Sequence, residues 1–232
     1  MTALRTRYHQ LVQDSRLEKP VSFSILFWLF IAGSLMGTLL EGVWHLLHKG
    51  RWGFRVGTLW GPFCVLYGFG VVIMYMAAVA IQNRGVPVQF AAFALTGSTV
   101  EYIASVFQEA CFGTTSWNYS AHAFNLGGRV SLKMTLLWGL AGIILMYVLL
   151  PLLLKNYHYF QLARRRILLQ FCTVFMCVNL LMTWAALARW QERVETALPA
   201  SNVLEAWLDD SWPDERLQDR FPNMQFVSRT AP

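Results

Sequence analysis

Three carboxylates are the residues of this chain whose type and position most directly suggest chemistry. Glu41, Glu101 and Glu109 are the only acidic residues between Lys19 and Gln191, a stretch that is otherwise strongly apolar. An ionisable side chain is costly inside a membrane span, so each of the three marks a candidate functional site. A carboxylate in such a place can exchange a proton, attract a cation, or act as a general acid or base. We therefore take all three as candidate catalytic or coupling residues.

Two histidines follow the first carboxylate at helical spacing. Glu41, His45 and His48 are separated by four and three residues, which places them on one face of a helix. They could ligate a metal or relay protons; alternatively, the two imidazoles could lie at the membrane interface among the lipid headgroups. The metal site is the less favoured interpretation, and we predict no cofactor.

Two polar connections could complete the site. Arg55 lies in the connection 48–60 and Arg129 in the connection 110–133. The helices that precede these connections end on the same side of the membrane, so both arginines can share a pocket with the three carboxylates. The same charges could instead form a structural ion-pair network that locks the helices together. The predicted substrate-binding residues are Arg55, Gln108, Trp117, Asn118, Tyr119, Asn125 and Arg129.

Composition identifies the elements that must position these side chains. The chain has 232 residues, of which 56% are hydrophobic and 14% are charged. An ordinary soluble domain carries about 25% charged residues, and so few charges could not cover the surface of a soluble core. This excludes a disordered chain, a coiled coil and a nucleic-acid-binding domain, despite the net charge of +6. We therefore predict a multi-pass integral protein of the cell (inner) membrane.

The predicted fold is an all-α bundle of about five transmembrane helices. A span needs about 20 apolar residues, and we expect a structured or re-entrant connection at 110–133. The predicted organisation is a polar N-terminal tail at 1–20, a transmembrane domain at 21–189, and a soluble C-terminal tail at 190–232. In that tail, Asn202 and Glu205 resemble the start of a short helix that Pro213 should end. The five predicted spans cover approximately residues 21–47, 61–82, 88–109, 134–154 and 167–187.

Glycines at helical spacing and two absences refine this prediction. Gly33 and Gly37 form a GxxxG step in the first span, which allows close helix packing in lipid. The four cysteines form no CxxC pair, so they favour neither a disulfide framework nor a zinc site. The sequence also has no phosphate-binding loop, so any ATP-driven activity would need a separate ATPase chain.

Several motifs in a definite order carry a resemblance to a known family. They are Glu41, Arg55, Gly61-Pro62, Leu66–Gly70, Glu101-Tyr102, Trp117–Ser120, Phe124–Arg129 and Leu137–Leu140. In this order they resemble the ABC-transporter type IV, or CmpB-like, family of bacterial membrane proteins over about residues 25–155, with the fifth span and the tail outside the match.

The chain departs from the pattern of this family at two places. Position 118 is Asn where the family carries Asp in Trp-Asp-Tyr-Ser, which removes a negative charge. The Asn-x-Asn-Gly-Arg motif of the family reads Asn125-Leu126-Gly127-Gly128-Arg129 here, so glycine replaces an amide side chain.

Three functions remain open at this point. The resemblance implies transport, and buried carboxylates beside arginines favour a permease-like transporter of a small polar or charged solute. The first alternative is a membrane-embedded enzyme acting on a lipid or isoprenoid phosphate, with the carboxylates as acid or base and the arginines on the phosphate. The second is a non-catalytic assembly or regulatory subunit. The expected partners are the lipid bilayer, a small solute or lipid substrate, and a second copy of the chain or a separate ATPase subunit; nucleic acid is not expected.

Overall fold

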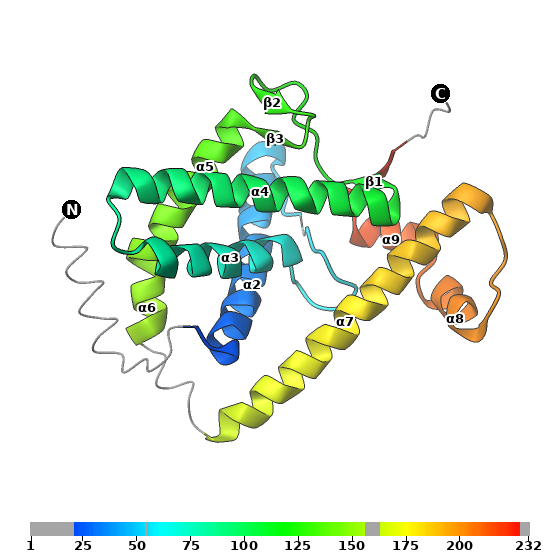
Figure 1. Ribbon diagram of the computed structural model, residues 1–232. Coiled ribbons are helices and arrows are strands. Elements are labelled where there is room, and N and C mark those ends of the chain that lie inside the picture. The colour runs from blue at the N-terminus through cyan, green and yellow to red at the C-terminus, as the bar shows by residue number, and fades with distance from the viewer. Residues whose placement is uncertain (1–20, 54, 156–162, 228–232) are drawn as a thin grey trace.

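The computed structural model describes residues 21–53, 55–155 and 163–227, and helices make up most of them (Figure 1). In Figure 1, α3 and α4 run side by side, while α7 crosses the view diagonally, passes the C-terminal end of α4 and leads to α8. The helices are α2 (Phe23–Lys49), α3 (Val65–Ile81), α4 (Val86–Phe112), α5 (Leu132–Ile144), α6 (Leu150–Lys155), α7 (Ala163–Thr196), α8 (Val203–Ser211) and α9 (Asp214–Arg220).

The strands of the described chain are short and form two antiparallel pairs. One pair joins segments that are far apart in the sequence, because β1 (Thr114–Thr115) pairs with β4 (Gln225–Phe226). The other is a local hairpin of β2 (Asn125–Leu126) and β3 (Val130–Ser131). The connection between α4 and α5 is therefore structured, as the sequence predicts.

Within the described ranges, four helices are long and apolar enough to cross a membrane. They are Phe23–Lys49, Val86–Phe112, Leu132–Leu152 and Arg166–Thr196. The all-α membrane fold is confirmed, but the predicted count of five is one too high by this measure. The chain is thus a multi-pass membrane protein, with four long apolar helices among its described residues.

The second predicted span is shorter than expected because its start is not helical. α3 has only 17 residues and begins at Val65, four residues after Gly61. Gly61 has a φ of +74°, and the Pro62 carbonyl accepts a hydrogen bond of 2.9 Å from the Thr38 hydroxyl of α2. The residues before α3 therefore belong to a loop that is tied to α2.

This loop is also held by polar side chains of α7. The Asn179 amide accepts from the Trp60 N–H at 3.1 Å and donates to the Trp60 carbonyl at 2.8 Å. The Thr183 hydroxyl accepts from the Leu59 N–H at 2.9 Å. Leu59 is buried, and buried backbone outside a helix needs hydrogen-bond partners, which α7 supplies.

A π-helical turn interrupts the third long helix. The turn, Leu145–Leu149, joins α5 to α6, and Pro151 follows it. Proline lacks the N–H that would bond four residues back, so it loosens the helix just before it. The helix continues through this π-helical turn into α6. The span predicted at about 134–154 is therefore confirmed as one continuous apolar helix, Leu132–Leu152.

Glycines bring the helices into close contact. A Cβ at Gly142 of α5 would lie on the Phe93 ring of α4, and one at Gly97 of α4 would lie 2.5 Å from Trp138. The predicted GxxxG step is also a packing face, because Cβ atoms at Gly33 and Gly37 would collide with Val71 and Tyr67 of α3.

The C-terminal segment packs on the end of α7. Asn202 caps α8 by accepting from the Glu205 N–H, as predicted, and α8 ends before Pro213. Arg189, which is 3% exposed, donates two hydrogen bonds of 2.9 and 2.8 Å to Asp209 of α8. Beside this ion pair lies an apolar cluster made of Leu59, Phe112, Ala186, Leu187, Trp190, Leu208, Trp212, Leu217 and Phe221.

Replacement of Gly142 by Ala should destabilise the bundle. The new methyl group would overlap the Phe93 ring, and overpacking of this kind costs about 1–3 kcal/mol. Gly70→Ala is the matched control, because a Cβ at Gly70 meets nothing within 4 Å and alanine favours a helix. Thermal unfolding in detergent should give a lower midpoint for G142A and an equal or higher one for G70A. Equal midpoints for G142A and the native chain would contradict this packing.

Docking of the C-terminal segment should weaken in acid. The hydrogen bonds from Arg189 lower the pKa of Asp209 from 3.8 to about 2. A lowered pKa in the folded state stabilises docking above the ordinary pKa, and that contribution is lost as pH falls through the folded value. Pepsin, which cleaves in acid, should therefore cut the segment increasingly between about pH 4 and about pH 2.

The Asp209→Asn variant should already be cut at pH 4. Asp210→Asn, which changes the neighbouring exposed carboxylate, should behave like the native chain. Equal pepsin resistance of D209N and the native chain at pH 4 would show that this ion pair does not hold the segment.

Candidate functional site

Glu101 is the most deeply buried of the three carboxylates. It lies in α4 and is 3% exposed. One oxygen accepts a hydrogen bond of 2.8 Å from the Tyr119 hydroxyl, and the other accepts one of 3.0 Å from the Trp138 indole N–H. Among the described residues no arginine or lysine forms a salt bridge with it. Neutral donors from the 113–131 connection and from α5 therefore hold this carboxylate.

Glu41 is paired with a cation. Its Oε2 lies 3.0 Å from Nη1 of Arg55, and its Oε1 accepts a hydrogen bond of 2.9 Å from the Tyr67 hydroxyl. Nη2 of Arg55 lies 3.1 Å from Nε2 of His45. The pair is partly buried, with 20% of the Glu41 side chain and 29% of the Arg55 side chain exposed. The 50–64 loop thus carries its arginine back onto α2.

Aromatic side chains connect the two carboxylates. The Tyr67 and Trp138 rings lie 6.1 Å apart between centroids, and each donates to a different glutamate. Burial, followed by the adjacent Glu101 carboxylate, raises the pKa of Tyr119 well above its usual range, and the charge of Glu41 adds to this effect. Tyr119 therefore keeps its proton and donates it in the hydrogen bond to Glu101.

Glu109 forms a second ion pair, with Arg129. The two side chains meet at 2.6 Å, and Arg129 also donates to the Ser105 hydroxyl at 3.0 Å. Ser105 and Glu109 follow Glu101 at four-residue steps along one face of α4. The five charged residues predicted to share a pocket therefore divide into two ion pairs and one carboxylate bonded by neutral groups.

The remaining predicted site residues organise the 113–131 connection. Gln108 donates to the hydroxyls of Thr114 and Ser116 at 3.1 and 2.9 Å. The Trp117 indole donates to the Arg129 carbonyl at 3.0 Å. Gln108 thus ties the start of the connection to α4, and Trp117 ties the start of the connection to its end.

The two asparagines bond within the connection itself. Asn118 accepts from the Ser120 N–H at 2.8 Å and is exposed. Asn125 accepts from the Gly128 N–H at 3.0 Å and donates to the His122 carbonyl at 2.9 Å. Gly127 and Gly128 both have positive φ, which glycine adopts without strain. The two glycines of this motif, the first of which replaces the asparagine of the family, thus suit the turn that positions Arg129.

The histidines of α2 do not converge on one point with Glu41. His45 contacts Arg55, whereas the His48 ring is exposed and stacks on Trp44 with centroids 3.7 Å apart. In the part of the chain that the structure describes, no group of three His, Cys, Asp or Glu side chains is arranged to hold a metal ion. The guanidinium of Arg55 occupies the position between Glu41 and His45.

The C-terminal segment covers the Arg55 side of the site. Arg220 of α9 donates to the Thr58 carbonyl at 3.0 Å and also bonds the Gly61 carbonyl. A small cavity of about 40 Å³ remains, lined by Arg55, Val56, Ser116, Phe221, Pro222, Asn223 and Met224.

Sequence reasoning about charge named Tyr119 but missed three other neutral partners of these charged groups, Tyr67, Ser105 and Trp138. Tyr67 and Trp138 lie in motifs that carry the family resemblance, and Ser105 lies one helical turn after Glu101. Helical spacing could have pointed to Ser105. The two aromatic donors come from other helices, so no local spacing connects them to their carboxylates.

A comparison with known families decides the relationship of this chain. The model of the family described as "Putative ABC-transporter type IV" matches residues 28–184, more than half of the chain. The chain belongs to this family. The match to ABC-transporter type IV confirms the resemblance and extends it through most of α7, which the motifs alone had left outside. Together with the apolar helices it indicates a membrane protein related to transport. No curated protein and no solved structure matches the chain.

A double-mutant cycle should detect coupling between Glu41 and Arg55. Glu41→Gln or Arg55→Gln alone leaves a partly buried charge without its ion-pair partner, which should lower the free energy of unfolding by about 1–3 kcal/mol. The double variant should lose less than the sum, because neither charge remains. Unfolding in mixed micelles with rising denaturing detergent measures all four proteins. Strictly additive losses would contradict a coupled pair.

Proposed function

We propose that this chain is the membrane-spanning part of a transporter for a small polar or charged solute, in which Glu101 exchanges a proton or a cation. The observation that carries the proposal is the state of Glu101: a carboxylate that is 3% exposed and bonded only by neutral donors among the described residues. An unpaired carboxylate inside a span is costly, and proton relays and ion pathways are where such groups occur.

The flanking ion pairs supply groups that can hold a charged solute. Arg55 and Arg129 contact carboxylates at 3.0 and 2.6 Å, and arginine also binds carboxylate or phosphate groups of ligands. Nε of Arg55 is buried and has no hydrogen-bond partner among the described residues. A solute anion could exchange with a glutamate at either arginine, while Glu101 takes or releases the compensating proton.

The source of energy follows from the same residues. Because the sequence has no phosphate-binding loop, ATP-driven transport would need a separate ATPase chain, and the description of the family supports that partner. Coupling to a proton at Glu101 would need no such chain. We place the protein in the inner membrane of a bacterium, as the family resemblance suggests.

Reconstitution into liposomes tests the proposal. Liposomes containing a pH-sensitive dye are exposed to a panel of small carboxylates, inorganic phosphate and amino acids. At least one solute should move protons in a protein-dependent way. Glu101→Gln should lower that flux by about tenfold or more, because a positioned proton-transfer group contributes about 100-fold or more to the step that it serves. Glu215→Gln, which alters an exposed carboxylate of α9, should not change it.

Two results would count against the proposal. Solute flux that is equal in E101Q and the native chain would contradict the coupling role of Glu101. Absence of protein-dependent flux across the panel would contradict transport by this chain alone.

The milder variant Tyr119→Phe, which removes one donor to Glu101, should shift the pH at which flux is half-maximal without abolishing it.

A further inference from the structure

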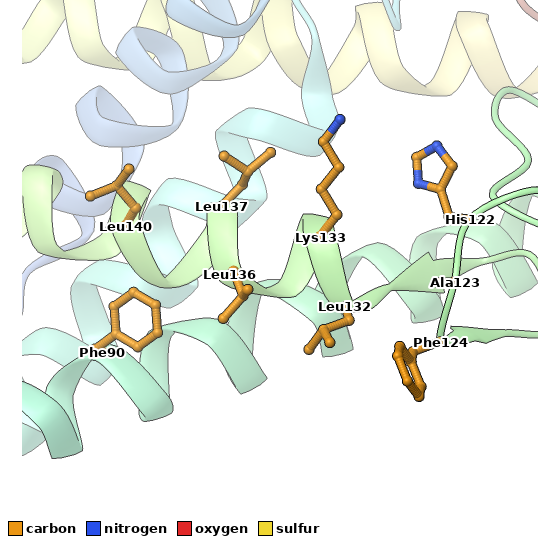
Figure 2. A pocket seen from close by; sticks show the side chains of 9 residues that line it. All are labelled: Phe90, His122, Ala123, Phe124, Leu132, Lys133, Leu136, Leu137 and Leu140. Atoms are coloured by element: carbon orange, nitrogen blue, oxygen red, sulfur yellow. The ribbon is translucent and has the colours of Figure 1, made fainter.

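An apolar groove runs along the outer face of α5, away from the carboxylates. It has a volume of about 900 Å³, within the range of sites that bind small molecules. Its floor consists of leucines of α5, with Phe90 of α4 at one end and Phe124 of the hairpin at the other (Figure 2). The residues that line it are Phe90, His122, Ala123, Phe124, Leu132, Lys133, Leu136, Leu137 and Leu140.

One end of the groove is basic. Figure 2 shows the side chains of Lys133 and His122 extending to the same side, at the end of the row of leucines. Lys133 is exposed, and among the described residues it forms no salt bridge. Nδ1 of His122 lies 3.3 Å from the Ser131 hydroxyl, so the ring has a defined orientation. An ammonium group and an imidazole here offer donors to an anion.

The polarity of the groove follows the polarity of a bilayer. Lys133 lies in the first turn of a helix that is long and apolar enough to span the membrane, which places it near the headgroup region. From Lys133 to Leu140 the groove descends by about 10 Å along the helix axis, at 1.5 Å per residue. Leu136, Leu137 and Leu140 are each about half exposed (50%, 47% and 50%). The groove therefore begins at headgroup level and continues into the hydrocarbon layer.

We propose that this groove binds one anionic phospholipid, with its phosphate at Lys133 and His122 and an acyl chain along Leu136, Leu137 and Leu140. The charge at one end and the apolar floor match the two parts of such a lipid. An acyl chain carries no polar groups, so it needs no hydrogen-bond partners along this leucine floor, while the lipid phosphate is complementary in charge to Lys133.

The bound lipid would also restrict the motion of Tyr119, which bonds Glu101. The N–H of His122 donates to the Tyr119 carbonyl at 2.8 Å, and the two rings lie 5.2 Å apart. Tyr119 in turn donates to Glu101. A headgroup on His122 would therefore contact a residue that is bonded directly to Tyr119, the Glu101 partner. The lipid site stands independently of the proposed transport function.

Native mass spectrometry of the full chain tests this site. The protein is released from nanodiscs made of phosphatidylglycerol or of phosphatidylcholine, and retained lipids are counted. The native chain should retain one phosphatidylglycerol and show at least about tenfold lower occupancy by phosphatidylcholine. Lys133→Gln should lower the phosphatidylglycerol occupancy by about tenfold, as expected when a charged donor is removed, and Lys133→Arg should preserve it.

A second variant and two controls make the result specific. Leu136→Trp should fill the groove and also lower lipid retention. Lys49→Gln changes an exposed lysine at the end of α2, and Leu168→Trp changes an exposed leucine of α7; both should retain the lipid. All variants are first checked for native helix content. Equal retention by K133Q, L136W and the native chain, or equal retention of the two lipids, would overturn the proposal.

Discussion

The structure depends on how three carboxylates are accommodated in an apolar bundle. A charged group in a low-dielectric environment must be paired or hydrogen-bonded, and each glutamate meets this requirement with residues from outside its own helix. Glu41 of α2 draws Arg55 from the following loop, and Glu109 of α4 draws Arg129 from the connection to α5. The two connections are therefore held against the bundle by the groups that they neutralise.

Glu101 sets the arrangement at the centre. It brings together Tyr119 of the 113–131 connection and Trp138 of α5, and the Trp138 ring in turn approaches Tyr67, the donor to Glu41. One hydrogen-bonded and aromatic network thus connects α2, α3, α4 and α5. Glu101 is bonded by neutral donors and not by an arginine. Protonation of Glu101 would therefore change the hydrogen bonds of this whole network. This is the physical basis on which a role in proton or cation exchange rests.

Buried backbone groups must also be hydrogen-bonded, and this explains the polar contacts of the loop before α3. This loop lies outside the helices, so its backbone groups need other partners, and Asn179 and Thr183 of α7 bond those of Leu59 and Trp60. The C-terminal segment adds Arg220, which donates to carbonyls of the same loop. α7 and the segment that follows it therefore hold in place the loop that carries Arg55.

The sequence by itself determined the class of the protein, the rarity of its internal carboxylates and the glycine faces, because composition and helical spacing are local properties. It also indicated the cap of α8 at Asn202. Tertiary structure alone decided which arginine meets which glutamate, and that Glu101 meets none among the described residues. It also decided that α3 begins late, at Val65, because the preceding residues bond to α2 and α7. Contacts between distant helices have no period in the sequence, and the partner of a buried charge is chosen by packing.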